Sequence, residues 1–107
     1  MVVVLVTSPS MELAKEIAKT LIQEEKAACV NIVPKVLSIY KWQGELFEED
    51  EVLLFIKTTS LKKVKERILE LHSYEVPEIV ALEVKEGHKD YISWVKESVK
   101  EEPPFNI

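Results

Sequence analysis

Residues 51–59 read EVLLFIKTT, a run whose centre is continuously apolar. Val52, Leu54 and Ile56 point to one side of an extended chain, whereas Leu53 and Phe55 point to the other. A strand with hydrophobic side chains on both sides is typical of a sheet whose two faces are both covered. The run therefore predicts a strand that something packs against on each face.

A second long strand precedes this run, and the two together predict a β-hairpin. It extends from Ala28 to Trp42 and is bent at Pro34, because proline has no N–H to donate to a sheet ladder. A turn, Gln43–Glu45, joins the two strands. We interpret the acidic residues around this tip as a soluble hairpin end that blocks edge association: Glu45, Glu48, Glu49, Asp50 and Glu51. A hard-cation site is the alternative, although the spacing does not match an EF-hand loop.

The rest of the chain alternates between strand and helix patterns. The further predicted elements are a strand from Val2 to Thr7, a helix from Met11 to about Lys26 capped by Ser8 or Ser10, a helix capped by Ser60 and ending at about His72, a strand from Ile79 to Val84, and a helix from Tyr91 to Lys100 capped by Asp90. This order predicts an α+β, ferredoxin-like β-α-β-β-α-β fold with an extra C-terminal helix.

Each predicted helix carries one apolar stripe. The stripes consist of Leu13, Ala14, Ile17, Ala18 and Leu21 in the first helix, of Leu61, Val64, Ile68 and Leu71 in the second, and of Trp94, Val95 and Val99 in the third. The first two helices cover one face of the sheet, and the last is too short to cover the other face under so long a hairpin. Because an exposed apolar hairpin invites aggregation, we expect another subunit to cover the remainder.

Composition narrows the class of protein. The 107 residues fit a single domain, residues 1–107, and the net charge of -5 disfavours a nucleic-acid partner. The two glycines are too few for a glycine-rich phosphate-binding loop. The lone cysteine excludes an intrachain disulfide and fits a reducing compartment. The apolar start, Met1–Val6, lacks the basic region of a signal peptide, and no run reaches the roughly 18 residues of a membrane span.

Three segments carry motifs that together resemble a known family. They read AACVNIVP at residues 27–34, SIYKWQG at residues 38–44 and LHSYEVPEI at residues 71–79, and KTT at 57–59 and DYISW at 90–94 accompany them. In order and spacing, from Val3 to about Ser98, the chain resembles the CutA family of divalent-cation tolerance proteins.

The resemblance implies a ferredoxin-like fold in a tightly associated, cytoplasmic homotrimer whose architecture is similar to that of PII signalling proteins. In such a trimer the long hairpins continue the sheets between subunits. The resemblance also implies a link to copper and other divalent metals. Two positions depart from the family pattern. Ser73 stands where the family usually has proline and is expected to loosen the loop that carries His72. Lys35 replaces a frequent glycine and puts a long cation near the strand bend.

Cys29 and His72 are the candidate metal ligands. Cys29 is either a small buried hydrophobe or, by resemblance to the family's cysteine, a thiolate ligand for copper. His72 ends a helix, where it either caps that helix or ligates copper or zinc. Because these two residues cannot fill a four-coordinate site, carboxylates such as Glu75, water or a second subunit would complete it. We therefore predict a weakly bound copper ion, or another divalent cation, in a cleft between subunits. His88 is interpreted as solvated.

The other candidates would line such a cleft. Lys57 lies inside an apolar strand, where it either pairs with Glu75 or Glu78 or binds an anion between subunits. Three aromatic residues are interpreted as packing or interface residues, namely Tyr40, Trp42 and Tyr74.

Two functions fit these residues. The first is a homotrimeric divalent-cation tolerance protein that binds copper or related ions. The alternative is a PII-like signalling or adaptor trimer that binds a small anionic effector near Lys57 and Tyr40; an assembly domain without a ligand is a third possibility. An enzyme is not expected, because Cys29 has neither an oxyanion hole nor a helix N-terminus beside it.

Overall fold

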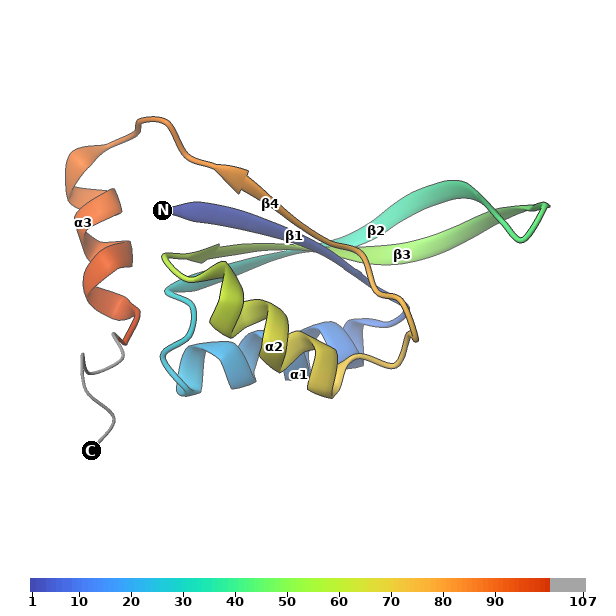
Figure 1. The fold of residues 1–107 in the computed structure, drawn as a ribbon, viewed down its shortest axis with the longest axis horizontal. Coiled ribbons are helices and arrows are strands. Elements are labelled where there is room, and N and C mark those ends of the chain that lie inside the picture. The colour runs from blue at the N-terminus through green and yellow to red at the C-terminus, as the bar shows by residue number, and fades with distance from the viewer. Residues whose placement is uncertain (101–107) are drawn as a thin grey trace.

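The chain has seven elements: four strands form one antiparallel sheet, two helices pack on one of its faces, and a third helix lies at the end of the sheet (Figure 1). The computed structural model describes residues 1–100. In chain order the elements are β1 (Val2–Ser8), α1 (Met11–Gln23), β2 (Cys29–Trp42), β3 (Glu45–Thr58), α2 (Leu61–Leu71), β4 (Ile79–Glu83) and α3 (Lys89–Ser98). The strand order is β2-β3-β1-β4. The predicted α+β, ferredoxin-like fold class is confirmed.

The core lies between the sheet and helices α1 and α2. Val4 of β1 is paired with Ile56 of β3 on one side and with Ala81 of β4 on the other, so these side chains point to the same face. The helix stripes close over this face with Ala14, Ile17, Leu21, Val64 and Ile68, all fully buried. The apolar stripes predicted for the first two helices are therefore confirmed.

The helix starts agree with the sequence in two cases and differ in the third. The Ser10 hydroxyl accepts from the Leu13 N–H at 3.1 Å and caps α1, and the Ser60 hydroxyl caps α2. In α3 the predicted Asp90 cap is wrong. The ring nitrogen Nδ1 of His88 accepts the Tyr91 N–H at 3.3 Å, so the helix begins one residue before Asp90.

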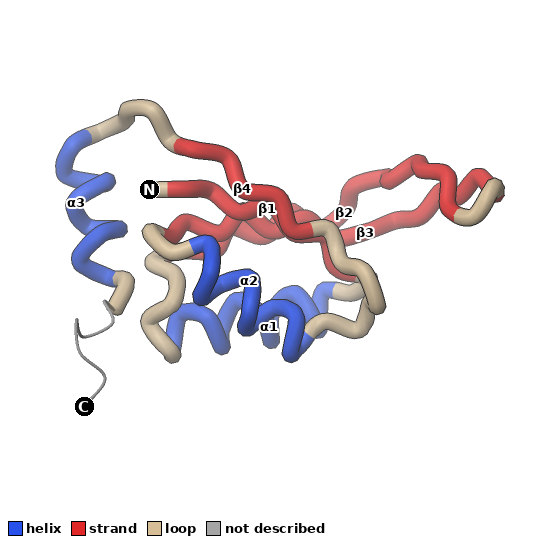
Figure 2. Tube along the Cα trace, in the orientation of Figure 1, coloured by secondary structure: helices blue, strands red, loops and turns tan. Residues whose placement is uncertain are grey.

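Helix α3 packs through a narrow edge at the end of the sheet opposite the hairpin tip (Figure 2). Val95 and Val99 are buried, as predicted, but Trp94 is 46% exposed and the prediction that it points inward is wrong. One side of α3 alone meets the sheet because the helix lies across the strand ends. The face of the sheet opposite α1 and α2 stays open there, and Leu82 on β4 is 54% exposed.

The β2–β3 hairpin is longer and more regular than predicted. β3 begins at Glu45 instead of Glu51, since acidic side chains are tolerated on a two-stranded ribbon that projects into solvent. The turn places Gln43 at φ 48° and Gly44 at φ 82°, the left-handed pair of a type I′ turn. This turn matches the right-handed twist of the strands.

A bulge at Pro34 reverses the side-chain alternation of β2. The pairing passes from Val33 opposite Leu53 to Val36 opposite Glu51, so β2 has one residue more than β3 at this point. The predicted bend at Pro34 is confirmed. Beyond the bulge Tyr40 lies opposite Phe47, and their rings stack with centroids 5.4 Å apart.

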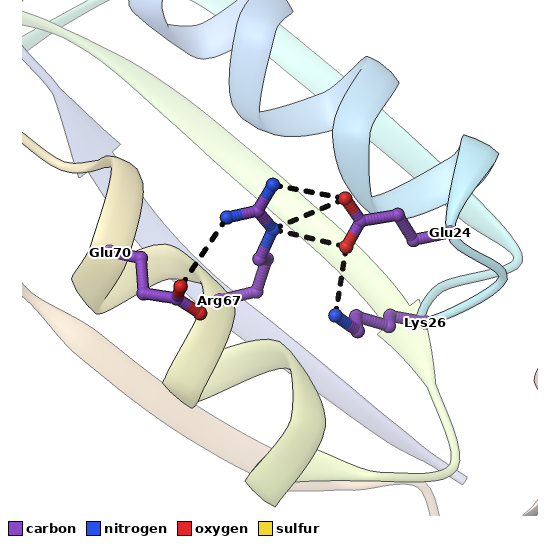
Figure 3. Close-up of polar contacts among 4 residues, drawn as sticks. All are labelled: Glu24, Lys26, Arg67 and Glu70. Atoms are coloured by element: carbon purple, nitrogen blue, oxygen red, sulfur yellow. Dashed lines mark hydrogen bonds and ion pairs between the residues drawn. The ribbon is translucent and has the colours of Figure 1, made fainter.

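An ion-pair network joins the end of α1 to α2 (Figure 3). The Arg67 guanidinium donates through Nε and Nη2 to both carboxylate oxygens of Glu24, each at 3.0 Å, and Lys26 donates to the same carboxylate at 2.8 Å. Hydrogen bonds from Arg67 and then Lys26 lower the pKa of Glu24. Glu70 holds the far side of the guanidinium at 3.6 Å.

Candidate functional site

A cleft of about 510 Å³ opens where the hairpin leaves the body of the sheet. Its lining comes from the end of β1, from both hairpin strands and from the loop between α2 and β4. The lining residues are Thr7, Tyr40, Trp42, Glu49, Glu51, Ser73, Tyr74, Glu75, Val76 and Glu78. Segments that are far apart in the sequence therefore form one concave surface.

His72 ties the α2–β4 loop to β1 beside this cleft. Its Nδ1 accepts the Tyr74 N–H at 3.0 Å, and its Nε2 lies 2.7 Å from the Thr7 carbonyl oxygen. An Nδ1 that accepts has no proton, so the ring is the neutral tautomer and Nε2 donates to Thr7. Because both ring nitrogens are engaged, His72 binds a metal only if one of these hydrogen bonds is given up.

Tyr74 connects the same loop to β3. Its phenol donates to Glu51 Oε2 at 2.9 Å, and Glu51 is only 7% exposed. Burial raises the pKa of Tyr74, and the hydrogen bond and negative charge of Glu51 raise it further. The pKa of Tyr40 is raised by burial first and then by Glu49. Both phenols stay protonated at neutral pH, and the Tyr74 hydroxyl donates to Glu51.

The cleft is acidic. Four of its ten lining residues are glutamates, and none of the ten is Lys, Arg or His: the glutamates are Glu49, Glu51, Glu75 and Glu78. Such a lining attracts cations and repels anions. It therefore opposes the small anionic effector of the alternative hypothesis at this position.

The structure brings together most of the predicted cleft residues. Tyr40, Trp42, Tyr74, Glu75 and Glu78 all line the cleft. Sequence reasoning treated Glu49 and Glu51 as part of the solvated tip and did not consider Thr7. The spacing of two between Glu49 and Glu51 indicated a common face, but nothing in the sequence showed that the α2–β4 loop lies against that face.

Cys29 and Lys57 lie elsewhere. Cys29 on β2 is paired with Lys57 on β3, and Lys57 is paired in turn with Val3 on β1. His72 instead contacts Thr7, which lies four residues further along β1. At about 3.3 Å per residue this separates the two sites by roughly 13 Å. The Lys57 ammonium donates to Asn31 Oδ1 rather than to Glu75 or Glu78, and the Cys29 thiol lies 3.9 Å from the same oxygen.

One subunit therefore does not bring Cys29 to His72 and Glu75. Within residues 1–100, no three side chains of His, Cys, Asp or Glu are placed to hold a single metal ion. In the same range no helix is long and apolar enough to cross a membrane.

The chain matches the family model of the CutA1 divalent ion tolerance protein over residues 2–98. It is 55% identical over 98 residues to the divalent-cation tolerance protein CutA of Thermus thermophilus, a match that covers 90% of this chain and 95% of that protein. It is 42% identical over 94 residues to human Protein CutA, covering 86% of this chain but only 52% of the human one.

Solved structures agree with this match. The divalent cation tolerance protein of Thermus thermophilus superposes with a TM-score of 0.90 at 53% identity, over 94% of this chain and 100% of that one. A periplasmic divalent cation tolerance protein CutA from Archaeoglobus fulgidus gives 0.89 at 34% identity, over 94% and 100%. The motifs, the fold and these relatives lead to one conclusion: the chain belongs to the CutA1 family of divalent ion tolerance proteins.

Proposed function

We propose that this chain is a homo-oligomeric, non-enzymatic protein that binds divalent cations, copper among them, and so contributes to metal tolerance. The acidic cleft is the observation that carries the proposal, because its four glutamates face no basic lining residue. Carboxylate oxygens bind hard divalent ions and Cu(II) at exchangeable sites. The family's description names divalent ion tolerance and no reaction.

Glu75 and Glu78 are the cleft glutamates best able to reach an ion, since both are exposed on the α2–β4 loop. Glu51 is already bonded to Tyr74. With so few free ligands in one subunit, the ion is weakly held and exchangeable. Cys29 and His72 would share an ion only if a second subunit placed one beside the other.

The open sheet face supports assembly, and we propose a homotrimer. Leu82 and Val80 are about half exposed on β4, and Leu37 and Leu46 are exposed along the hairpin. Apolar surface on this scale is typical of an interface rather than of an isolated subunit. A cytoplasmic location stays a prediction that rests on the family resemblance, with which the free Cys29 agrees because it fits a reducing compartment.

Isothermal titration with Cu(II), Zn(II) and Mg(II) tests the cation site. The variant Glu75→Gln/Glu78→Gln removes two cleft charges, and Glu16→Gln/Glu86→Gln removes two exposed charges outside the cleft lining. We expect the first variant to weaken Cu(II) binding about tenfold or more and the second to leave it unchanged. Equal affinities for the two variants would remove the cleft from the proposal.

Two further measurements complete the test. Cys29→Ser and His72→Gln in separate titrations show whether either residue ligates copper. Light scattering at micromolar concentration reports the assembly, and a stable monomer would contradict a shared site. Leu82→Glu on the open face is expected to lower the measured mass, because it buries a charge in the interface.

A further inference from the structure

The acidic cleft also contains three aromatic side chains. Tyr40 and Trp42 reach it from β2, and Tyr74 reaches it from the α2–β4 loop. Two of the rings are held in place. The ring of Tyr40 stacks on Phe47 at an interplanar angle of 20°, and that of Tyr74 lies 4.8 Å from the His72 ring with its hydroxyl bonded to Glu51. The Tyr40 and Tyr74 rings are therefore preorganised by their contacts with Phe47, His72 and Glu51.

The aromatic rings add a feature that metal binding in this cleft does not use. A metal ion needs several oxygen, nitrogen or sulfur ligands within about 2.5 Å and gains little from aromatic rings. The cleft glutamates are spread over β3 and the α2–β4 loop, and no three acidic, histidine or cysteine side chains of residues 1–100 converge on one point. Dispersed carboxylates beside aromatic faces match a larger cation whose charge is spread over several carbon atoms.

We propose that the cleft binds an organic ammonium cation, with Tyr40 and Trp42, which are neighbours on one face of β2, against the alkylated ammonium group and the glutamates neutralising its charge. Aromatic faces attract such cations through their quadrupoles, and tetraalkylated ammonium groups suit them because they are weakly hydrated. A volume of about 510 Å³ holds a ligand larger than the ammonium group alone. The inference uses the proposed cation cleft but does not depend on metal binding.

The electrostatics of the tyrosines agree with this ligand class. Burial, followed by Glu51 for Tyr74 and by Glu49 for Tyr40, raises the pKa of each phenol. Both rings therefore stay uncharged, and the two glutamates that add to the effect of burial also attract an ammonium ion. An anion or a neutral ligand gains nothing from that attraction.

The direct test compares choline with 3,3-dimethylbutan-1-ol, which has the same shape but no charge. Trp94 is replaced by Phe so that Trp42 is the only tryptophan, and its fluorescence reports binding to the assembled protein. We expect choline to change the Trp42 emission in a saturable way. Half of the change should be reached at a choline concentration at least tenfold lower than that of the alcohol. Equal responses to the two compounds would overturn the proposal.

Variants assign the contact to the aromatic side chains. Trp42→Leu should weaken choline binding about tenfold by calorimetry, whereas Trp42→Phe, which keeps a ring, should restore most of it. Trp94→Leu makes the same change on α3, at a half-exposed tryptophan outside the cleft lining, so it is the matched control and should bind like the parent chain. Circular dichroism and light scattering confirm that each variant keeps its fold and mass. Unchanged binding in a folded Trp42→Leu variant would overturn the proposal.

Two further arms identify the source of the ammonium group and separate this inference from metal binding. Choline represents a free alkylammonium ligand, and a short peptide with one trimethyllysine represents a protein side chain. The tighter ligand of the two identifies the source, and failure of both to bind overturns the inference. Cu(II) titration of Trp42→Leu should match the parent chain, since the metal uses only the glutamates. Loss of choline binding with Cu(II) binding intact, or the reverse, therefore shows which proposal fails.

Discussion

The phenol of Tyr74 donates a hydrogen bond to the carboxylate of Glu51, with 2.9 Å between Oη and Oε2. This contact spans 23 residues of sequence and joins the α2–β4 loop to the sheet. His72 adds a second connection, from the same loop to the Thr7 carbonyl oxygen. The loop that carries Glu75 and Glu78 is thus fixed at two points, and its position defines the cleft.

Removing the Tyr74 hydroxyl should destabilise the fold. Tyr74→Phe leaves the buried Glu51 carboxylate without its donor, which costs roughly 1–3 kcal/mol of unfolding free energy. Urea denaturation at pH 7 measures the change. Tyr91→Phe is the control, because Tyr91 is exposed on α3, and it should alter stability by less than about 0.5 kcal/mol. Equal effects of the two substitutions would contradict the role of the Tyr74–Glu51 contact.

Stability should fall at alkaline pH in a manner that depends on Tyr74. Its pKa in the folded state lies above the ordinary value of 10.0, so the folded chain keeps a proton that the unfolded chain loses. The contribution of the protonated Tyr74 phenol to the free energy of unfolding is complete below pH 10 and is lost as the pH rises through the raised pKa of the folded state. Urea midpoints between pH 9 and pH 11 should decline differently in the parent chain and in Tyr74→Phe, because only the parent chain carries this phenol. Parallel declines would show that Tyr74 titrates normally.

His72 should be the neutral tautomer with its proton on Nε2. The assignment follows from the Tyr74 N–H, which donates to Nδ1. Long-range proton–nitrogen correlation spectra of the ring should show Nδ1 as the unprotonated nitrogen. His72→Ala removes both hydrogen bonds and should destabilise the chain by roughly 1–3 kcal/mol. A proton on Nδ1 would rule out the hydrogen-bond chain described here.

The hairpin turn should respond to substitution as a type I′ turn. Gly44 has φ 82° with open space around it, so Gly44→Ala is destabilising through backbone strain alone, by about 1 kcal/mol. Gln43 has φ 48°, and Gln43→Asn should stabilise the turn by a few tenths of a kcal/mol, because asparagine tolerates this conformation better. In thermal unfolding, Gly44→Ala should lower the Tm and Gln43→Asn should raise it. A stabilising Gly44→Ala would exclude this turn type.

Acid should weaken the connection between α1 and α2. The pKa of Glu24 lies below its ordinary value of 4.5, chiefly because of Arg67. The contribution of the ionised Glu24 carboxylate to the free energy of unfolding is therefore complete above pH 4.5. It is lost as the pH falls through the lowered pKa of the folded state. Glu24→Gln should flatten the decline in the urea midpoint between pH 5 and pH 2.5, and should couple to Arg67→Ala in a double-mutant cycle. Independent effects of the two substitutions would argue against the pair.

Local elements and their order follow from the amino-acid sequence alone. The helical stripes of α1 and α2 appear in the spacing of Ile17, Leu21, Val64 and Ile68, because burial on one face demands that period. The bend at Pro34 was equally readable, since a missing N–H is a local property of the residue. The doubly apolar centre of β3 likewise indicated a sheet with two faces to cover.

Which side chains meet in the cleft depends on the tertiary structure. The bulge at Pro34 reverses the alternation of β2, and a one-residue shift moves every later side chain to the other face. The contact of Tyr74 with Glu51 and the distance of Cys29 from His72 both depend on sheet register. Register and loop position arise from contacts between segments distant in the sequence, so local patterns of hydrophobicity do not predict them.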